Sequence, residues 1–135
     1  MSANLDLVRS IYADWERGDF SKAEWADPEI EYVQVGGLAP GSWTGLAGMA
    51  QAMRRWLSSW EDFRMGADEF RELDGEQVLV LIRRSGRGKI SHLDVKGAGA
   101  LVFHLRESEV TRLVLYNDRE RAFADLGLAP EGDPA

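Results

Sequence analysis

The feature that most constrains the fold is the apolar run from Val110 to Asn117, which ends directly before a helix-starting acid. Side chains alternate between the two faces of a β-strand, so Leu113 and Leu115 share one face with Asn117, and the residues between them form the opposite face. Both faces are largely apolar, which indicates a strand that is covered on both sides. A buried amide needs a hydrogen-bond partner, so Asn117 marks either a pocket or the cap of the helix that follows.

Along the whole chain the predicted order is helix, helix, strand, helix, four further strands and a short closing helix. Apolar residues at helical spacing, or capping residues, predict four helices, at residues 4–17, about 21–26, 46–59 and 118–126. Alternating patterns predict strands at residues 29–35, 63–73, 76–84, 90–106 and 110–117, with a short extended piece around Trp43. Asp74-Gly75 is a hairpin signal, and Gly97 and Gly99 predict a bulge or bend in the long strand.

This order predicts an α+β domain in which helices pack against a strongly curved, mostly antiparallel sheet. A single domain is expected over residues 1–128, and residues 129–135 are expected to form a flexible tail. A curved sheet that wraps over helices forms a cone with an open mouth, and ligands bind in such concave sites.

Composition excludes several classes of function. The chain has 135 residues and no cysteine, which excludes disulfides and thiolate-ligated metals, and its two histidines lack the spacing of a metal site. Its net charge of −7 argues against nucleic acid as the main partner, although residues 83–89 form a basic hairpin. The sequence has neither a membrane-spanning run nor a signal-peptide pattern, so we expect a cytoplasmic protein without a membrane partner.

Four segments together resemble the nuclear-transport-factor-2-like superfamily, within it the SnoaL-like and ketosteroid-isomerase-like branch. They are Tyr12–Asp19, Ala26–Tyr32, Trp43–Gly45 and Leu115–Glu120, and the resemblance extends to about Leu128. It implies a cone-shaped, cystatin-like α+β barrel with a central cavity, no cofactor, and a homodimer formed through the sheet. This scaffold hosts isomerases, cyclases, hydrolases and binding modules, so the resemblance alone does not identify the function.

The resemblance also allows a comparison of catalytic positions. Tyr32 stands where ketosteroid-isomerase-like enzymes carry their general-base aspartate, and Leu101 stands where they carry an acid that donates to the oxyanion. Tyr12 lies within one position of their oxyanion tyrosine. Because a leucine cannot donate a proton, the sequence does not support steroid-type isomerisation.

His92 and Asp94 form the pair that most resembles the histidine–aspartate chemistry of SnoaL-like cyclases. Imidazole titrates near neutrality and a carboxylate can orient it, so the pair is a candidate proton carrier. An unbroken strand that places Leu101 inside would point both side chains outward. A polar pair at the surface is therefore the favoured interpretation, and catalysis the alternative.

The remaining candidates would line a cavity rather than react. Tyr32 is a candidate donor to a ligand carbonyl, and packing in the core explains it equally well. The other candidate ligand-binding residues are Tyr12, Trp15, Gln34, Trp43, Trp56, Leu101, Leu115 and Asn117.

The leading hypothesis is a SnoaL-like protein that binds a small apolar or oxygenated molecule in a central cavity. It is open whether the protein is also a cofactor-free isomerase, cyclase or hydrolase with Tyr32, His92 and Asp94 as catalytic residues. The alternative is a non-catalytic ligand-binding or dimerisation module of the same fold.

Overall fold

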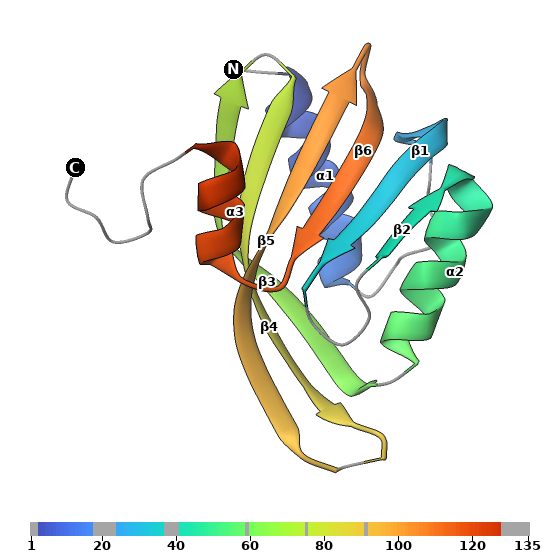
Figure 1. Cartoon of the computed structure of the whole chain (residues 1–135), viewed down its shortest axis with the longest axis vertical. Coiled ribbons are helices and arrows are strands. Elements are labelled where there is room, and N and C mark those ends of the chain that lie inside the picture. The colour runs from blue at the N-terminus through green and yellow to red at the C-terminus, as the bar shows by residue number, and fades with distance from the viewer. Residues whose placement is uncertain are drawn as a thin grey trace, which may run out of the picture.

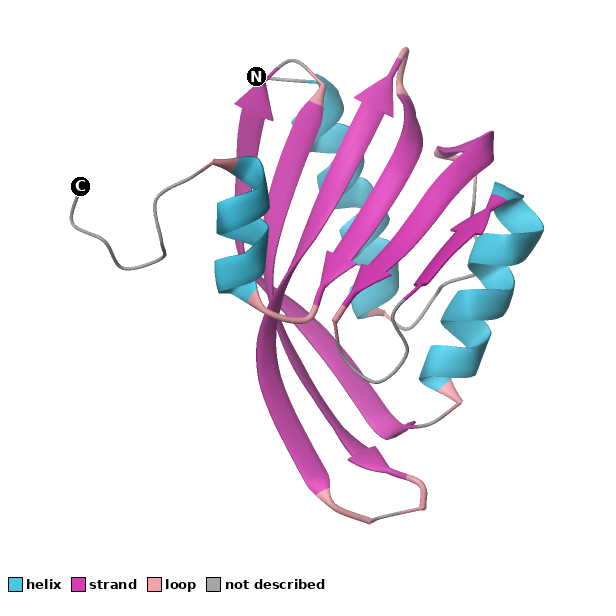
Figure 2. Cartoon of the chain, viewed as in Figure 1, coloured by secondary structure: helices cyan, strands magenta, loops and turns pink. Residues whose placement is uncertain are grey.

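The structure is a computed structural model that describes residues 3–17, 24–36, 41–58, 60–74, 76–90 and 92–127. In these residues the helices are α1 (Ala3–Glu16), α2 (Gly45–Leu57) and α3 (Arg119–Leu126). The strands are β1 (Ala26–Val35), β2 (Gly41–Thr44), β3 (Trp60–Asp74), β4 (Gln77–Gly88), β5 (Asp94–Arg106) and β6 (Glu109–Tyr116). The expected α+β class is confirmed (Figure 2).

The strands of the described residues form one six-stranded sheet in the order β2-β1-β6-β5-β4-β3. All neighbouring pairs run antiparallel except β1 and β6, which are parallel. The sheet curves strongly without closing, because β2 and β3 remain at its two edges. The expected barrel is therefore an open, curved sheet.

Helices cover the sheet on both faces (Figure 1). On the face that we call the inner face, α1 and α2 pack over a large core that includes Ile82, Phe103 and Leu113. On the outer face, α3 packs through Phe123 against a smaller core that includes Val114. The prediction that the strand at residues 110–117 is covered on both sides is confirmed.

Local sequence signals explain the boundaries of α3. The side chain of Asp118 accepts a hydrogen bond from the backbone N–H of Glu120, which satisfies one of the free donors at the helix start. Gly127 ends the helix with a φ of 71°, a left-handed conformation that glycine adopts without steric cost. The cap is thus Asp118, and the capping role considered for Asn117 is wrong.

The first strand differs from its prediction at its start. Glu24 and Trp25 form a turn and β1 begins at Ala26, while the rest of the predicted helix at residues 21–26 lies outside the described residues. Pro28 lies inside β1, in the stretch between Ala26 and Glu31 where the pairing with β6 is irregular. A proline is tolerated there because no ladder hydrogen bond needs its missing N–H.

The hairpin of β4 and β5 also differs from its prediction. Strand β4 runs to Gly88, beyond the predicted end at Arg84, and β5 begins at Asp94. The two strands pair without a register shift from Gln77–His104 to Arg87–Asp94, so the bulge predicted near Gly97 and Gly99 is absent there. The lower halves of the strands bend away from the rest of the sheet (Figure 1).

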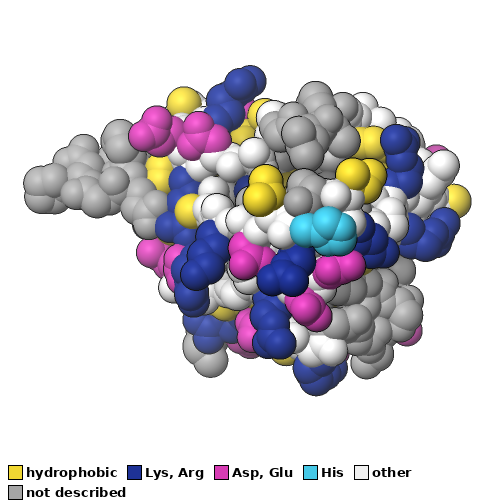
Figure 3. All heavy atoms as spheres, turned by 90° about the horizontal axis from the view of Figure 1, so that it is seen from below, with side chains coloured by type: hydrophobic (Ala, Val, Ile, Leu, Met, Phe, Trp, Pro, Cys, Tyr) yellow, Lys and Arg dark blue, Asp and Glu magenta, His cyan; other side chains and the backbone are white. Residues whose placement is uncertain are grey.

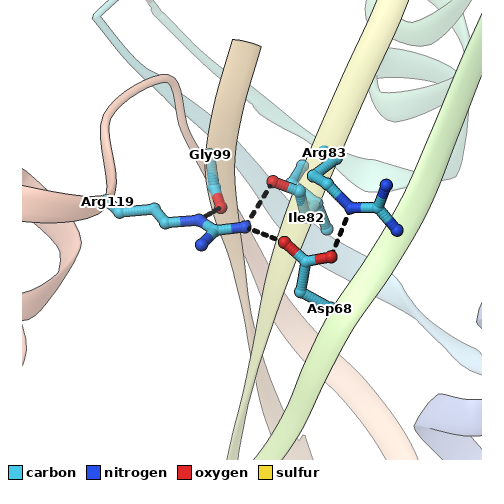
Figure 4. Close-up of polar contacts among 5 residues, drawn as sticks. All are labelled: Asp68, Ile82, Arg83, Gly99 and Arg119. Atoms are coloured by element: carbon cyan, nitrogen blue, oxygen red, sulfur yellow. Dashed lines mark hydrogen bonds and ion pairs between the residues drawn. The ribbon is translucent and has the colours of Figure 1, made fainter. Parts of the chain in front are cut away.

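A polar cluster ties α3 to the middle of the sheet (Figure 4). The guanidinium of Arg119 donates to the backbone oxygens of Gly99 at 3.1 Å and Ile82 at 3.0 Å, and it pairs with the carboxylate of Asp68 at 2.7 Å. Arg83 pairs with the same carboxylate. One side chain therefore joins α3 to β5, β4 and β3. None of the described helices has the length and apolarity needed to span a membrane.

Candidate functional site

A pocket opens on the inner face of the sheet, between the sheet and helices α1 and α2. Its wall consists of ten side chains: Trp15, Tyr32, Met53, Leu57, Phe63, Met65, Arg84, Leu101, Leu113 and Leu115. Eight of them are largely apolar, and the other two contribute the hydroxyl of Tyr32 and the guanidinium of Arg84. The arrangement is that of a small-molecule site, largely apolar with few polar groups.

The pocket measures about 450 Å³ when its opening to solvent is counted, and its interior cavity about 40 Å³. Since one water needs roughly 10–15 Å³ of such interior space, the inside holds a few waters or one end of a small ligand. The rest of a ligand would occupy the opening.

Strand alternation explains why these residues meet. Leu101 on β5 lies opposite Leu115 on β6, and Tyr32 on β1 lies beside Leu113 on β6. Directly paired residues share a face of the sheet, so all four side chains point to the inner face. The predictions that Tyr32, Leu101 and Leu115 face the cavity agree with this arrangement.

Tyr32 is a hydrogen-bond donor without a described acceptor. Its side chain is buried, and its oxygen accepts a hydrogen bond of 3.0 Å from the amide nitrogen of Gln34. Burial raises the pKa of Tyr32 above its ordinary value, and the hydrogen bond from Gln34 and the charge of Arg84 oppose the shift only in part. The hydroxyl therefore keeps its proton at neutral pH and can donate it to an acceptor in the pocket.

Aromatic side chains support Tyr32 and shape the wall. The ring of Trp43 lies 5.9 Å from the ring of Tyr32, so Trp43 contacts the site without lining the pocket. Trp15 lines the pocket and stacks on Phe103 at 6.0 Å. The side chain of Trp56 lies outside the described part of the structure.

Arg84 is the charged wall residue that the sequence did not identify. The apolar wall residues that were not predicted are Met53, Leu57, Phe63, Met65 and Leu113. Arg84 continues the inward alternation of Val78, Val80 and Ile82 on β4, whose buried side chains belong to the inner core. Because β4 runs past residue 84, the guanidinium reaches the pocket rather than a solvated turn. Burial lowers the pKa of Arg84, which is the direction expected for a cation taken out of water.

Asn117 takes part in the site indirectly. It is exposed at the end of β6 and does not line the pocket, although its side-chain oxygen accepts a hydrogen bond of 2.7 Å from Nη2 of Arg84. The predicted link between Asn117 and a pocket is therefore indirect, because Asn117 contacts Arg84 and Arg84 lines the pocket.

The structure does not bring His92 or Asp94 to Tyr32. His92 lies in the turn before β5 with a φ of 58°, rather than on the strand where the sequence placed it, and its side chain is exposed. Asp94 is exposed and pairs with Arg87 on the neighbouring strand at 3.0 Å. Neither residue lines the pocket, which fits the favoured interpretation of surface residues. On this lower side of the molecule, basic and acidic side chains are interspersed (Figure 3).

Tyr12 is buried but lies elsewhere in the core. Its ring packs edge-on against Phe70 of β3 with centroids 5.7 Å apart, and it does not line the pocket. Its hydroxyl has no described partner, and burial raises its pKa. Among the described residues, no group of three or more histidine, aspartate or glutamate side chains is arranged to hold a metal ion.

No protein-family model matches the sequence, and no curated protein matches it. Solved structures match the whole fold. TerC, crystallised with polyporic acid, is 22% identical over 93% of this chain and 98% of its own, with a TM-score of 0.75. An NTF2-like protein from Burkholderia thailandensis is 18% identical over 96% of this chain and 100% of its own, with a TM-score of 0.79.

A candidate SnoaL-like polyketide cyclase from Jannaschia is 12% identical over 94% of this chain and 93% of its own, with a TM-score of 0.74. At such identities the likeness concerns the fold and not the activity. The fold implied by the sequence resemblance is confirmed: this chain has the nuclear-transport-factor-2-like fold that it shares with these SnoaL-like and NTF2-like structures.

Proposed function

We propose that the protein binds a small, largely apolar organic molecule in the pocket of the inner face. The observation that carries the proposal is an apolar wall in which two polar groups, the Tyr32 hydroxyl and the Arg84 guanidinium, have donors without a described acceptor. Buried donors of this kind normally find a partner, and a ligand would supply it. The structure of TerC with polyporic acid supports the proposal, since a protein of this fold was crystallised with a small organic compound.

The neutral fluorescent probe N-phenyl-1-naphthylamine tests this proposal, because its emission rises in apolar sites. We expect the wild-type protein to enhance its fluorescence and Met53→Trp, which adds a bulky ring to the pocket wall, to reduce that enhancement at least about tenfold. Leu46→Trp is the matched control, since Leu46 lies on the same helix α2 but does not line the pocket. If the probe binds Met53→Trp as well as it binds the control, the pocket is not the binding site.

Catalysis by Tyr32 is the second candidate, and one observation favours it. Gln34 donates to the tyrosine oxygen, so the phenolic proton is free to polarise a carbonyl or hydroxyl of a bound compound. A cofactor-free isomerase, cyclase or hydrolase would use such a donor. Tyr32→Phe removes the hydroxyl and keeps the ring, so turnover of any substrate should be abolished while its binding persists. Unchanged turnover would exclude this role.

The composition of the wall favours binding over acid–base catalysis. Among the described residues, no aspartate, glutamate or histidine lines the pocket, so the wall offers hydrogen-bond donors and no carboxylate or imidazole as a general base. A non-catalytic binding protein needs no such base.

A further inference from the structure

Arg84 is a half-buried cation in an apolar wall, and none of the described side chains of that wall is acidic. Its neighbours Arg83 and Arg87 on β4 pair with the carboxylates of Asp68 and Asp94. In the described part of the chain Arg84 forms no ion pair, and its hydrogen bonds all leave from Nη2 towards Asn117. Charged side chains are seldom buried without a partner, because removing a charge from water is costly.

Most of the donors of this guanidinium are unused. Its Nε is buried and has no hydrogen-bond partner, and Nη1 donates to no described atom. The guanidinium keeps its positive charge at neutral pH, since an arginine side chain does not deprotonate in proteins. The described part of the pocket wall therefore holds one positive charge and several free N–H groups, without a negative charge among its side chains to balance them.

The sheet is built so that Arg84 lies in this position. To reach Asn117 beyond β6, its side chain crosses β5 at Gly97 and Gly99. A Cβ on Gly99 would lie 3.2 Å from Nη2 of Arg84, and one on Gly97 would lie 4.0 Å from it. The two glycines leave room for the guanidinium, and the carbonyl groups of Asn117 hold its far end at 2.7 and 3.3 Å. This geometry fixes Arg84 before any ligand arrives.

We propose that the pocket selects ligands that carry an acidic oxygen, such as a carboxylate or enolate, and that Arg84 binds this oxygen. Tyr32 lines the same pocket and carries a second free donor, so an anionic oxygen there meets a charge and a hydroxyl. Hydrogen bonds between charged groups are the strongest that side chains form, which makes the acidic group the main determinant of affinity. Asn117 acts as a positioning residue, because it touches Arg84 and does not line the pocket. The inference rests on the proposed function and adds the chemical class of the ligand.

Matched pairs of aryl acids and their amides test this inference by titration calorimetry at pH 7.5. The pairs are benzoate with benzamide, 2-naphthoate with 2-naphthamide, and biphenyl-4-carboxylate with its amide. Each pair has nearly the same shape and differs in charge. We expect the wild-type protein to bind at least one acid about tenfold or more tightly than its amide, as a charged hydrogen bond in an apolar site predicts.

Variants then assign the preference to Arg84. Arg84→Met should weaken acid binding at least about tenfold and leave amide binding within about twofold. Asn117→Ala should weaken acid binding by a smaller factor, with the amide unaffected. Arg87→Met is the matched control, since Arg87 lies on the same strand, is exposed and does not line the pocket. It should keep the wild-type preference.

Equal affinity for acids and amides in the wild-type protein would overturn the inference, even if Arg84→Met fails to fold. An acid preference that survives in Arg84→Met would overturn it as well. In both cases binding of the neutral probe N-phenyl-1-naphthylamine remains intact if the proposed function holds. Loss of all binding, that of the neutral probe included, would refute the proposed function together with the inference.

Discussion

Replacing Gly99 with alanine adds one methyl group at a crowded point of the sheet. The new Cβ would lie 2.6 Å from the backbone oxygen of Tyr116, and 3.2 and 3.4 Å from Nη2 and Cζ of Arg84. The first distance is well inside van der Waals contact with an atom of the backbone. Strand β6 or β5 must therefore shift, and Arg84 must move away from its place beneath Asn117.

The cost follows from similar cases of overpacking. Inserting a methyl group into a well-packed site destabilises a protein by about 1–3 kcal/mol. For a domain of this length, 1 kcal/mol lowers the melting temperature by roughly 3–5 °C. We expect Gly99→Ala to melt about 3–15 °C below the wild-type protein by circular dichroism, and to unfold at a lower urea concentration.

Gly97→Ala provides the control on the same strand and face. Its Cβ would lie 4.0 Å from Nη2 of Arg84 and, beyond its chain neighbours, within 4 Å of no other heavy atom of the described residues; Gly97 itself is exposed. It should change the stability by less than about 0.5 kcal/mol. Combining Gly99→Ala with Arg84→Met should cost less than the sum of the single changes, because the pair shares one contact. If Gly99→Ala is as stable as Gly97→Ala, the close approach is not present in the protein and the reasoning fails.

Substitutions at Asp118 and Phe123 test the outer face, and a substitution at Asp68 tests the cluster of Figure 4. Asp118→Ala removes the carboxylate that accepts a hydrogen bond from the backbone N–H of Glu120, and should lower the free energy of unfolding in urea by about 1 kcal/mol. Asp118→Asn keeps a capping oxygen and should therefore retain most of this stability. Phe123→Ala leaves a cavity in the core beneath α3, where Phe123 is 2% exposed, and should lower the free energy of unfolding by about 3–5 kcal/mol. A loss below about 1 kcal/mol would mean that α3 does not pack against the sheet.

The hydrogen bond from Arg119 lowers the pKa of Asp68 below its usual value, so this carboxylate contributes stability above its unfolded-state pKa of about 3.9. That contribution is lost as the pH falls through the lower, folded-state pKa, and urea unfolding below pH 4 should therefore be less pH-dependent in Asp68→Asn than in the wild-type protein.

Much of the fold was predictable because its signals are local. The two apolar faces of the strand ending at Tyr116, and the helix that begins after it, each follow from a few adjacent residues, although the cap considered there was Asn117 and the structure has Asp118. The inward facing of Leu115 followed from alternation along its strand, and that of Leu101 followed from its matching position in the family resemblance. The length of β4 did not follow, because residues 85–88 are polar and glycine-rich and have the composition of a turn. Pairing with β3 and β5 keeps them extended despite that composition.

The site was harder to predict because its polar partners lie far apart in the sequence. The pattern identified Asn117 as an amide in need of a partner, and that partner is Arg84, which lies 33 positions earlier and two strands away. A sequence signal for Arg84 did exist, since it continues the inward alternation of Val80 and Ile82. Its use required knowing that β4 continues beyond residue 84. The two glycines of β5 point to the same conclusion. Taken alone, they indicate a bulge, whereas beside an inward arginine they indicate a path for its side chain. Because Gly97 pairs directly with the inward Arg84, the glycine and the arginine together indicate that the side chain of Arg84 crosses β5 and contacts Asn117. Neither residue indicates this contact by itself.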